Sequence, residues 1–274
     1  MESANPAPAV THDAGGAWVN RDSRKRALES LLLQLADDDL VFGHRSSEWL
    51  GLAPDLEEDI AFSSISQDEV GHATFYYSLL ASLTGTDADM LAFGRDASER
   101  LNARLLEQEN RDWAYTIARA FVYNAFEQVR LEALLQSSFE PLKQGAEKIL
   151  REEHYHLVHM QTWFQNLGCS TAEAKRRLTE GLEQVERDWN DMFHLGPWEA
   201  TLLEEKILPW SATELHRRWR AKVKPVFASV GTPLPEPAMV DEARSGRCGG
   251  HTPSLRQLLV TMTEVYRSDT TAQW

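Results

Sequence analysis

Two short strings in the sequence combine a carboxylate and an imidazole at a spacing that suits metal binding. Each has the form Glu-x-x-His; they are Glu69-Val70-Gly71-His72 and Glu153-His154-Tyr155-His156. Both lie within long stretches whose apolar residues recur at helical spacing. Because positions i and i+3 fall on one face of an α-helix, each string directs its Glu and His side chains the same way. One copy says little, but two copies indicate a duplicated helix pair.

In one class of four-helix bundle, two helices carry Glu-x-x-His and each of the other two supplies a carboxylate. These side chains point into the bundle and bind two iron or manganese ions, as in ferritin-like proteins. The two strings therefore predict an all-α, ferritin-like four-helix bundle. Apolar stripes that continue after residue 170 predict additional C-terminal helices.

The first of the two further carboxylates is expected on the helix before Glu69. Asp39 lies there on an apolar face, with Leu32, Leu35 and Phe42 at helical spacing. A carboxylate on an apolar face is costly unless it is paired or bound to metal. Asp39 is therefore a predicted ligand, whereas the nearby Asp37 is interpreted as a solvated side chain.

The second further carboxylate is expected in the middle of the third long helix, where Asn124 and Glu127 share a face. Glu127 offers a carboxylate and Asn124 only a neutral carbonyl, and iron and manganese prefer carboxylate and imidazole ligands. Both residues remain candidates. The predicted ligands are Asp39, Glu69, His72, Glu127, Glu153 and His156, with Asn124 as the alternative to Glu127.

The helices that must position these residues follow from apolar periodicity and from helix start and stop signals. Residues 1–20 are expected to form a disordered tail, and residues 21–274 a single ferritin-like helical domain. Gly71, inside the second helix, costs about 1 kcal/mol against Ala, and a close approach of another helix would explain it. Long helices are expected over residues 22–49, 55–83, 112–138 and 141–167, and further helices over residues 171–194, 211–229 and 253–267.

The composition argues against several classes of protein. The chain of 274 residues carries a formal net charge of −14, whereas a nucleic-acid or anionic-membrane partner requires a basic face. No apolar run approaches the ~20 residues of a membrane span, and the first residues lack the apolar core of a signal peptide. Cys169 and Cys248 are far apart in sequence, so they predict neither a disulfide framework nor a thiolate metal site. We therefore expect a cytoplasmic protein with no nucleic acid or membrane as partner.

Other segments of the chain resemble a known family. The dipeptide Glu48-Trp49 and the segment Ala-Pro-Asp-Leu-Glu-Glu-Asp-Ile-Ala at residues 53–61 resemble the C subunit of bacterial phenylacetyl-CoA epoxidase, from aerobic phenylacetic acid degradation. So do Gly249-Gly250 and residues 251–274. The resemblance covers residues 28–274 and implies a ferritin-like, all-helical fold. In that family the C subunit resembles the catalytic A subunit, pairs with it and is generally considered structural.

The complete system of that family adds a small B subunit, an assembly factor and a reductase that carries flavin and an iron–sulfur cluster. It uses O2 and reducing equivalents from NADPH to epoxidise the ring of the CoA thioester. The resemblance thus implies an accessory C-type subunit that contacts both an A-type and a small B subunit, in a homo- or hetero-oligomer.

The two Glu-x-x-His strings depart from the C-subunit pattern, because C subunits of the family have typically lost them. Residues 67–72 and 152–156 are instead similar to the two motifs of the catalytic A subunit. By the same resemblance, Asp39 stands where the A subunit has its first glutamate. Asn124 stands where the A subunit has an aspartate, so the fourth carboxylate is missing unless Glu127 replaces it.

Three functions follow as alternatives. The first is the accessory subunit, which retains two iron or manganese ions or, if the site is a relic, no metal. The second is a di-iron oxygenase in its own right, in which Glu69 and Glu153 bridge the metals and His72 and His156 cap them. The third is a ferritin-like protein of metal storage.

Overall fold

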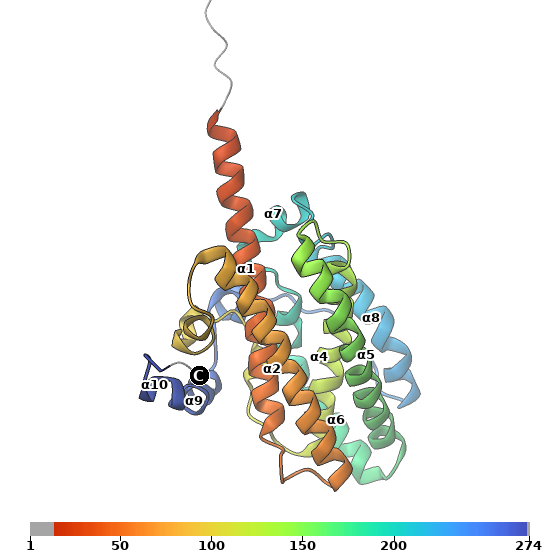
Figure 1. The fold of residues 1–274 in the computed structure, drawn as a ribbon. Helices are drawn as coiled ribbons and strands as arrows, with labels where there is room; N and C mark the ends of the chain where they lie inside the picture. The colour runs from red at the N-terminus through yellow and green to blue at the C-terminus, as the bar shows by residue number, and fades with distance from the viewer. Residues whose placement is uncertain (1–13, 273–274) are drawn as a thin grey trace, which may run out of the picture.

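Two pairs of long helices form the centre of the protein (Figure 1). The structure, a computed structural model, describes residues 14–272, with side chains from residue 22 onward. Helix α1 (Ala14–Ser47) packs along α2 (Leu56–Thr84), and α4 (Trp113–Leu134) packs along α5 (Glu140–Cys169). No β-strand occurs between residues 14 and 272. The predicted all-α, ferritin-like bundle is therefore confirmed.

Shorter helices complete the fold, and the predicted C-terminal helices are among them. The α-helices are α3 (Arg104–Glu107), α6 (Ala172–Trp189), α7 (Glu199–Glu204), α8 (Ala212–Ser229), α9 (Pro253–Met262) and α10 (Glu264–Ser268). A π-helical turn spans Met90–Gly94, and 3-10 turns span Ala97–Glu99, Asn190–Phe193, Gly196–Trp198, Glu242–Arg244 and Gly246–Cys248.

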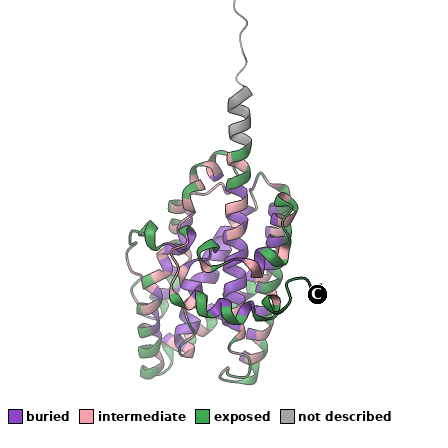
Figure 2. Cartoon of the chain, turned by 90° about the vertical axis from the view of Figure 1, so that its left-hand side faces the viewer, coloured by how far each residue is buried: buried purple, intermediate pink, exposed green. Residues whose placement is uncertain are grey.

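The shorter helices cover the centre from two sides. Helices α6 and α8 pack on α4, so that nearly every residue of α4 is buried. Figure 2 shows the buried residues running down the long helices. Helices α9 and α10 lie beside α1, on the side away from α5 and α8 (Figure 1). Within residues 14–272, no helix combines the length and apolarity that a membrane crossing requires.

Side-chain caps explain why α2 and α4 begin at the expected places. Asp55 accepts a hydrogen bond from the Glu58 N–H, and Asp112 accepts one from the Tyr115 N–H, each at 2.9 Å. Such caps satisfy N–H groups that the first turn of a helix leaves unpaired. Gly85 ends α2 in the left-handed conformation, with φ of 76°, which glycine adopts without strain.

Helix α1 begins earlier than the sequence predicts. It starts at Ala14, whereas the sequence predicts a start near Asp22. Residues 14–20 of the expected disordered tail are therefore helical, because extending an existing helix adds one hydrogen bond for each residue that becomes ordered. Residues 1–13 lie outside the described part of the chain, and the rest of that expectation lies with them.

Gly71 does not mark a close helix contact, contrary to the expectation from the sequence. A Cβ atom built at Gly71 meets no other atom within 4 Å. Gly181 in α6 shows the contrast, because its Cβ would lie 2.9 Å from the Cα atom of Tyr115 in α4. Helices α4 and α6 thus cross tightly at Gly181, whereas Gly71 borders open space.

The segment that follows α8 returns across the bundle and is held there by buried polar contacts. His251 Nδ1 lies 2.7 Å from Glu107 Oε2, and His251 Nε2 lies 2.8 Å from the carbonyl oxygen of Arg100. Both ring nitrogens face acceptors, so both carry protons. Burial would lower the pKa of His251, but the contacts with Glu107 and the Arg100 carbonyl outweigh burial and raise it.

Replacing His251 should therefore change stability in a pH-dependent way. A group whose folded pKa is raised stabilises the protein fully below its unfolded pKa, about 6.5 for His, and this stabilisation is lost as the pH rises through the folded pKa. We expect the His251→Gln variant to be less stable than the wild type at about pH 6, with a difference that shrinks toward higher pH. Urea unfolding at several pH values measures both free energies of unfolding.

The control is His154→Gln, which replaces an exposed histidine of α5. This variant should differ little from the wild type at every pH. A stability difference for His251→Gln that grows with pH would contradict the charged state assigned to His251.

Candidate metal centre

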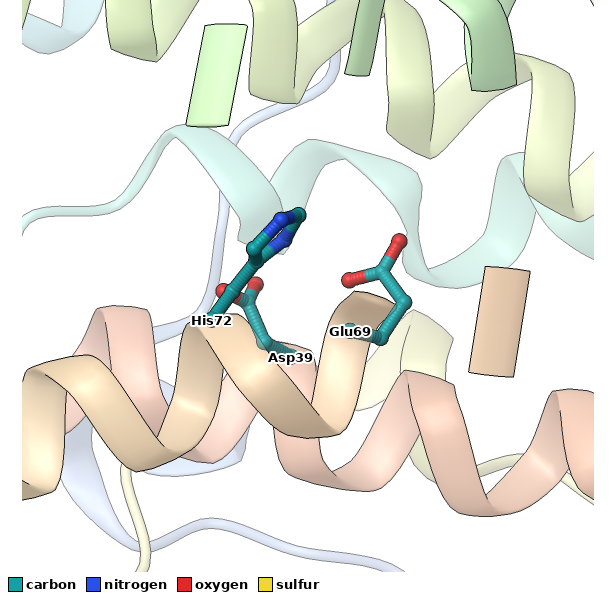
Figure 3. A group of neighbouring side chains, drawn as sticks. All are labelled: Asp39, Glu69 and His72. Atoms are coloured by element: carbon teal, nitrogen blue, oxygen red, sulfur yellow. The ribbon is translucent and has the colours of Figure 1, made fainter. Parts of the chain in front are cut away.

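Five of the six predicted ligands meet in the middle of the bundle. They form two groups, and within each group one oxygen or nitrogen atom of every residue lies within 4.8 Å of the others. None of the five residues is more than 4% exposed. Figure 3 shows the first group, in which two side chains of α2 and one of α1 point toward the same space. The first group is Asp39, Glu69 and His72, and the second is Glu69, Glu153 and His156.

The innermost atoms of this cluster lack hydrogen-bond partners among the described residues. They include both oxygens of Glu69, Oδ2 of Asp39, Oε2 of Glu153 and Nδ1 of His72. Two of these atoms lie at longer range from an opposite group: Glu69 Oε1 is 3.5 Å from His156 Nδ1, and His72 Nδ1 is 3.6 Å from Glu153 Oε1. A buried polar atom without a partner costs roughly 1–3 kcal/mol, and more when it is charged. Native proteins leave few such atoms, and a bound ion is one recognised reason for them. Carboxylate oxygens together with imidazole nitrogens suit iron or manganese, so the residues fit a metal centre.

The outer nitrogen of each histidine is held by an acid from the opposite helix. His72 Nε2 lies 2.8 Å from Glu152 Oε2, and His156 Nε2 lies 3.2 Å from Asp68 Oδ2. Carboxylates only accept hydrogen bonds, so each Nε2 carries a proton and each Nδ1 is turned inward. Metal-binding histidines are typically held in this way. Sequence reasoning missed Asp68 and Glu152, although an acid directly before the glutamate of both strings was an available signal.

Shared protons partly offset the repulsion between the acids of the cluster. Burial and neighbouring carboxylates raise the pKa values of Asp39 and Glu69 well above the ordinary range. Burial would also raise the pKa of Glu153, but His156 outweighs burial and lowers it. Burial would lower the pKa of His156, but Glu153 outweighs that effect and raises it to about 11. The cluster thus holds protons that a bound divalent cation would displace.

Glu127, the sixth predicted ligand, lies outside both groups. Its Oε2 accepts a hydrogen bond from Arg130, one turn further along α4, and its Oε1 has no partner among the described residues. Burial raises the pKa of Glu127 to about 7, although Arg130 opposes the rise. Asn124 is fully buried on the same face of α4, and neither atom of its amide group has a hydrogen-bond partner within residues 22–272.

The three consecutive aspartates of α1 are all buried, and each has different partners. Asp37 pairs with Arg95 and Arg100, so the interpretation of Asp37 as a solvated side chain is wrong. The segment after α2 supplies both arginines and covers this side of α1. Asp39 accepts a hydrogen bond from the Tyr123 hydroxyl at 3.0 Å.

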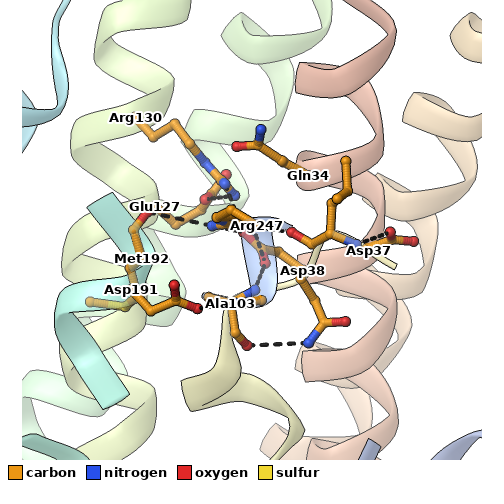
Figure 4. A network of polar contacts seen from close by, with 12 residues as sticks. Gln34, Asp37, Asp38, Ala103, Glu127, Arg130, Asp191, Met192 and Arg247 are labelled. Atoms are coloured by element: carbon orange, nitrogen blue, oxygen red, sulfur yellow. Dashed lines mark hydrogen bonds and ion pairs between the residues drawn. The ribbon is translucent and has the colours of Figure 1, made fainter. Parts of the chain in front are cut away.

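Asp38, the middle aspartate, connects the surroundings of the cluster to the C-terminal segment (Figure 4). Arg130 donates to Asp38 Oδ2 at 2.7 Å and, through its other amino group, to Glu127. Arg247 donates to both oxygens of Asp38, at 2.8 and 2.7 Å, across 209 positions of sequence. A continuous series of buried ion pairs therefore runs from Glu127 to Arg247.

Replacing Arg247 with Met should leave Asp38 buried with one cation fewer. Removing one partner of a buried ion pair typically costs about 3–5 kcal/mol. We expect Arg247→Met to lower the free energy of unfolding by about that amount in urea unfolding. The control is Arg267→Met, which removes a pair with Asp96 at 3.6 Å between side chains that are 53% and 81% exposed. This surface pair should contribute little, and equal losses in the two variants would contradict the role assigned to Arg247.

Known proteins resemble the chain along nearly its whole length. The family described as phenylacetic acid catabolic protein matches residues 14–274. The C subunit of the 1,2-phenylacetyl-CoA epoxidase of Escherichia coli (strain K12) is 32% identical over 249 residues, which are 90% of this chain and 99% of that relative. The A subunit of the epoxidase from the same organism is 22% identical over 237 residues, which are 82% of this chain and 74% of that relative. The resemblance to a C-type subunit is confirmed, and the chain belongs to the phenylacetic acid catabolic protein family.

Proposed function

We propose that the chain is an accessory C-type subunit of a cytoplasmic, multicomponent monooxygenase that epoxidises the ring of phenylacetyl-CoA in phenylacetate degradation, and that it retains a metal centre. Its partners are the small B subunit of that complex and a catalytic A-type subunit. The observation that carries the metal centre is the buried cluster of ligand atoms without partners. Similarity to the C subunit of the Escherichia coli epoxidase, over 99% of its length, supports the accessory role.

Two ions at this centre would share Glu69 as a ligand. The first ligand group adds Asp39 and His72, and the second adds Glu153 and His156. Iron bound there supplies the chemistry of O2 activation, and manganese suits the same ligands.

The other residues around the centre hold the ligands and keep water out. Asp68 and Glu152 fix the orientation of the two histidines through their outer nitrogens. Tyr123 holds one oxygen of Asp39 and leaves the other oxygen available. Because every ligand of the two groups is buried, carboxylates and imidazoles act there in a low-dielectric environment, where charge interactions are strong.

The ligand atoms of the second group are less available than those of the first, which supports an accessory role over a catalytic one. Each group has two carboxylates and one imidazole. In the second group, His156 Nδ1 already lies 3.0 Å from Glu153 Oε1, whereas His72 Nδ1 in the first group makes no hydrogen bond among the described residues. Asn124, which offers no charge, and Glu127, which is paired with Arg130, belong to neither group.

A second candidate function is a di-iron oxygenase that acts in its own right. The observation that favours it is that both Glu-x-x-His strings are intact and their atoms converge. This function requires both ligand groups to be filled, and it requires turnover without an A-type partner.

The metal centre predicts that the chain, purified after expression with iron, contains metal. We expect up to two ions per chain, in line with the two ligand groups. Glu69→Ala should lose most of this metal because Glu69 belongs to both ligand groups, and His156→Ala should lose the ion of the second group. His154→Ala, at an exposed position of the same string as His156, should keep the wild-type content. Elemental analysis measures the metal, and circular dichroism checks that each variant is folded. A metal-free wild type, both alone and with an A-type partner, would falsify the metal centre.

The accessory role predicts that the chain alone does not turn over phenylacetyl-CoA. With reductase, NADPH and O2, we expect no epoxide from the purified chain and epoxide formation once the A-type subunit is added. Mass spectrometry of the CoA ester measures the product. Epoxidation by the chain alone would exclude the accessory role and establish the second candidate instead.

A further inference from the structure

Two grooves lie between α2 and α5, on either side of the acids that hold the histidines. Helix α2 packs mainly along α1, and α5 mainly along α4, so that α2 and α5 meet through few contacts, among them His72 with Glu152 and His156 with Asp68. The lining of the first, the Gly71 groove, encloses about 450 Å³ and includes Asp68, Gly71, His72, Phe75, Ile149 and Glu152. The lining of the second, the Tyr155 groove, encloses about 520 Å³ and includes Ser64, Asp68, Glu152, Tyr155 and His156.

We propose that a divalent cation reaches the buried cluster through the Gly71 groove. This inference rests on the metal centre proposed above and adds its access route. His72 joins the groove to the cluster, because its Nε2 faces Glu152 in the groove wall and its inner Nδ1 makes no hydrogen bond, lying 3.6 Å from Glu153 Oε1. An ion that passes Glu152 therefore meets an available ligand atom.

The Tyr155 groove ends differently. His156 lies at its inner end, and both nitrogens of this histidine are occupied. Nδ1 lies 3.0 Å from Glu153 Oε1, and Nε2 lies 3.2 Å from Asp68 Oδ2. An ion that arrived here would have to break a buried contact before it found a ligand, so the Gly71 groove is the easier route.

Gly71 itself keeps the first groove open. It is exposed, it directly precedes His72, and a Cβ atom at this position meets nothing within 4 Å. A glycine inside a helix is destabilising, and no close contact requires this one. A larger side chain at this position would project into the groove. The groove wall also carries Asp68 and Glu152, and the side chain of Glu152 is 34% exposed, so it attracts a cation from solvent.

The test is the rate at which metal-free protein takes up Co²⁺, followed by stopped-flow measurement of the visible absorption of the bound ion. Gly71→Leu fills the groove and replaces no ligand. Because entering and leaving ions use the same route, the rate of Co²⁺ uptake and the rate of Co²⁺ release should fall together. The dissociation constant for Co²⁺ should stay unchanged. We expect a fall of about tenfold in each rate, which corresponds to a barrier about 1.4 kcal/mol higher.

Three further variants serve as controls. Gly71→Ala adds only a methyl group in open space and should keep the wild-type rates. Ser64→Leu fills the Tyr155 groove and should keep them too. Gln144→Trp narrows the Gly71 groove from α5 and should slow both rates, which would show that the effect does not come from a disturbed α2.

The outcomes separate the route from the metal centre. Unchanged rates in Gly71→Leu and Gln144→Trp, or slower uptake in Ser64→Leu alone, would overturn the route and leave the metal centre standing. Weaker Co²⁺ affinity with an unchanged uptake rate would also overturn the route, because that is the effect of a disturbed ligand. A wild-type chain that binds no Co²⁺ would overturn the metal centre of the proposed function and the route with it.

Discussion

Negative charge buried at the centre of the bundle is the constraint on which the rest of the structure depends. Taking one ionised carboxylate out of water costs several kcal/mol unless an opposite charge or a proton offsets it. On one side of α1, arginines compensate the buried negative charge. On the other side, protons shared among the acids compensate it, and a bound metal ion would also do so. The buried acids nearest this centre include Asp37, Asp38, Asp39, Glu69, Glu127 and Glu153.

The two kinds of charge compensation occur at neighbouring positions of α1. Asp38 faces the fixed charges of Arg130 and Arg247, which come from α4 and from the C-terminal segment. Asp39 follows it directly and, because successive helix positions point about 100° apart, it turns toward Glu69 on α2. The arginines compensate part of the buried charge without a metal ion. On the other face, Oδ2 of Asp39 and both oxygens of Glu69 make no hydrogen bond within the described chain. A metal ion taken up there after folding would need a route from solvent.

The range of each interaction explains how much the sequence could predict. The long helices, both Glu-x-x-His strings and Asp39 were predictable because helix periodicity determines which side chains share a face. The burial of Asp37 was not, because it depends on Arg95 and Arg100, which lie 58 and 63 positions further along in an irregular segment. Arg247 was missed for the same reason, since it follows a long stretch without periodicity. Whether a carboxylate meets a metal or a guanidinium is decided by such distant partners, and no local pattern shows them.

The contact between Glu153 and His156 determines how evenly two ions could be held. His156 Nδ1 lies 3.0 Å from Glu153 Oε1, and both residues belong to the second ligand group. An ion in the second group would have to break this buried contact before it reached the imidazole. In the first group, Oδ2 of Asp39 and Nδ1 of His72 make no hydrogen bond within the described chain. An ion in the first group would therefore be held more tightly than an ion in the second. Such inequality fits the accessory role proposed above better than an oxygenase whose two ions must work together.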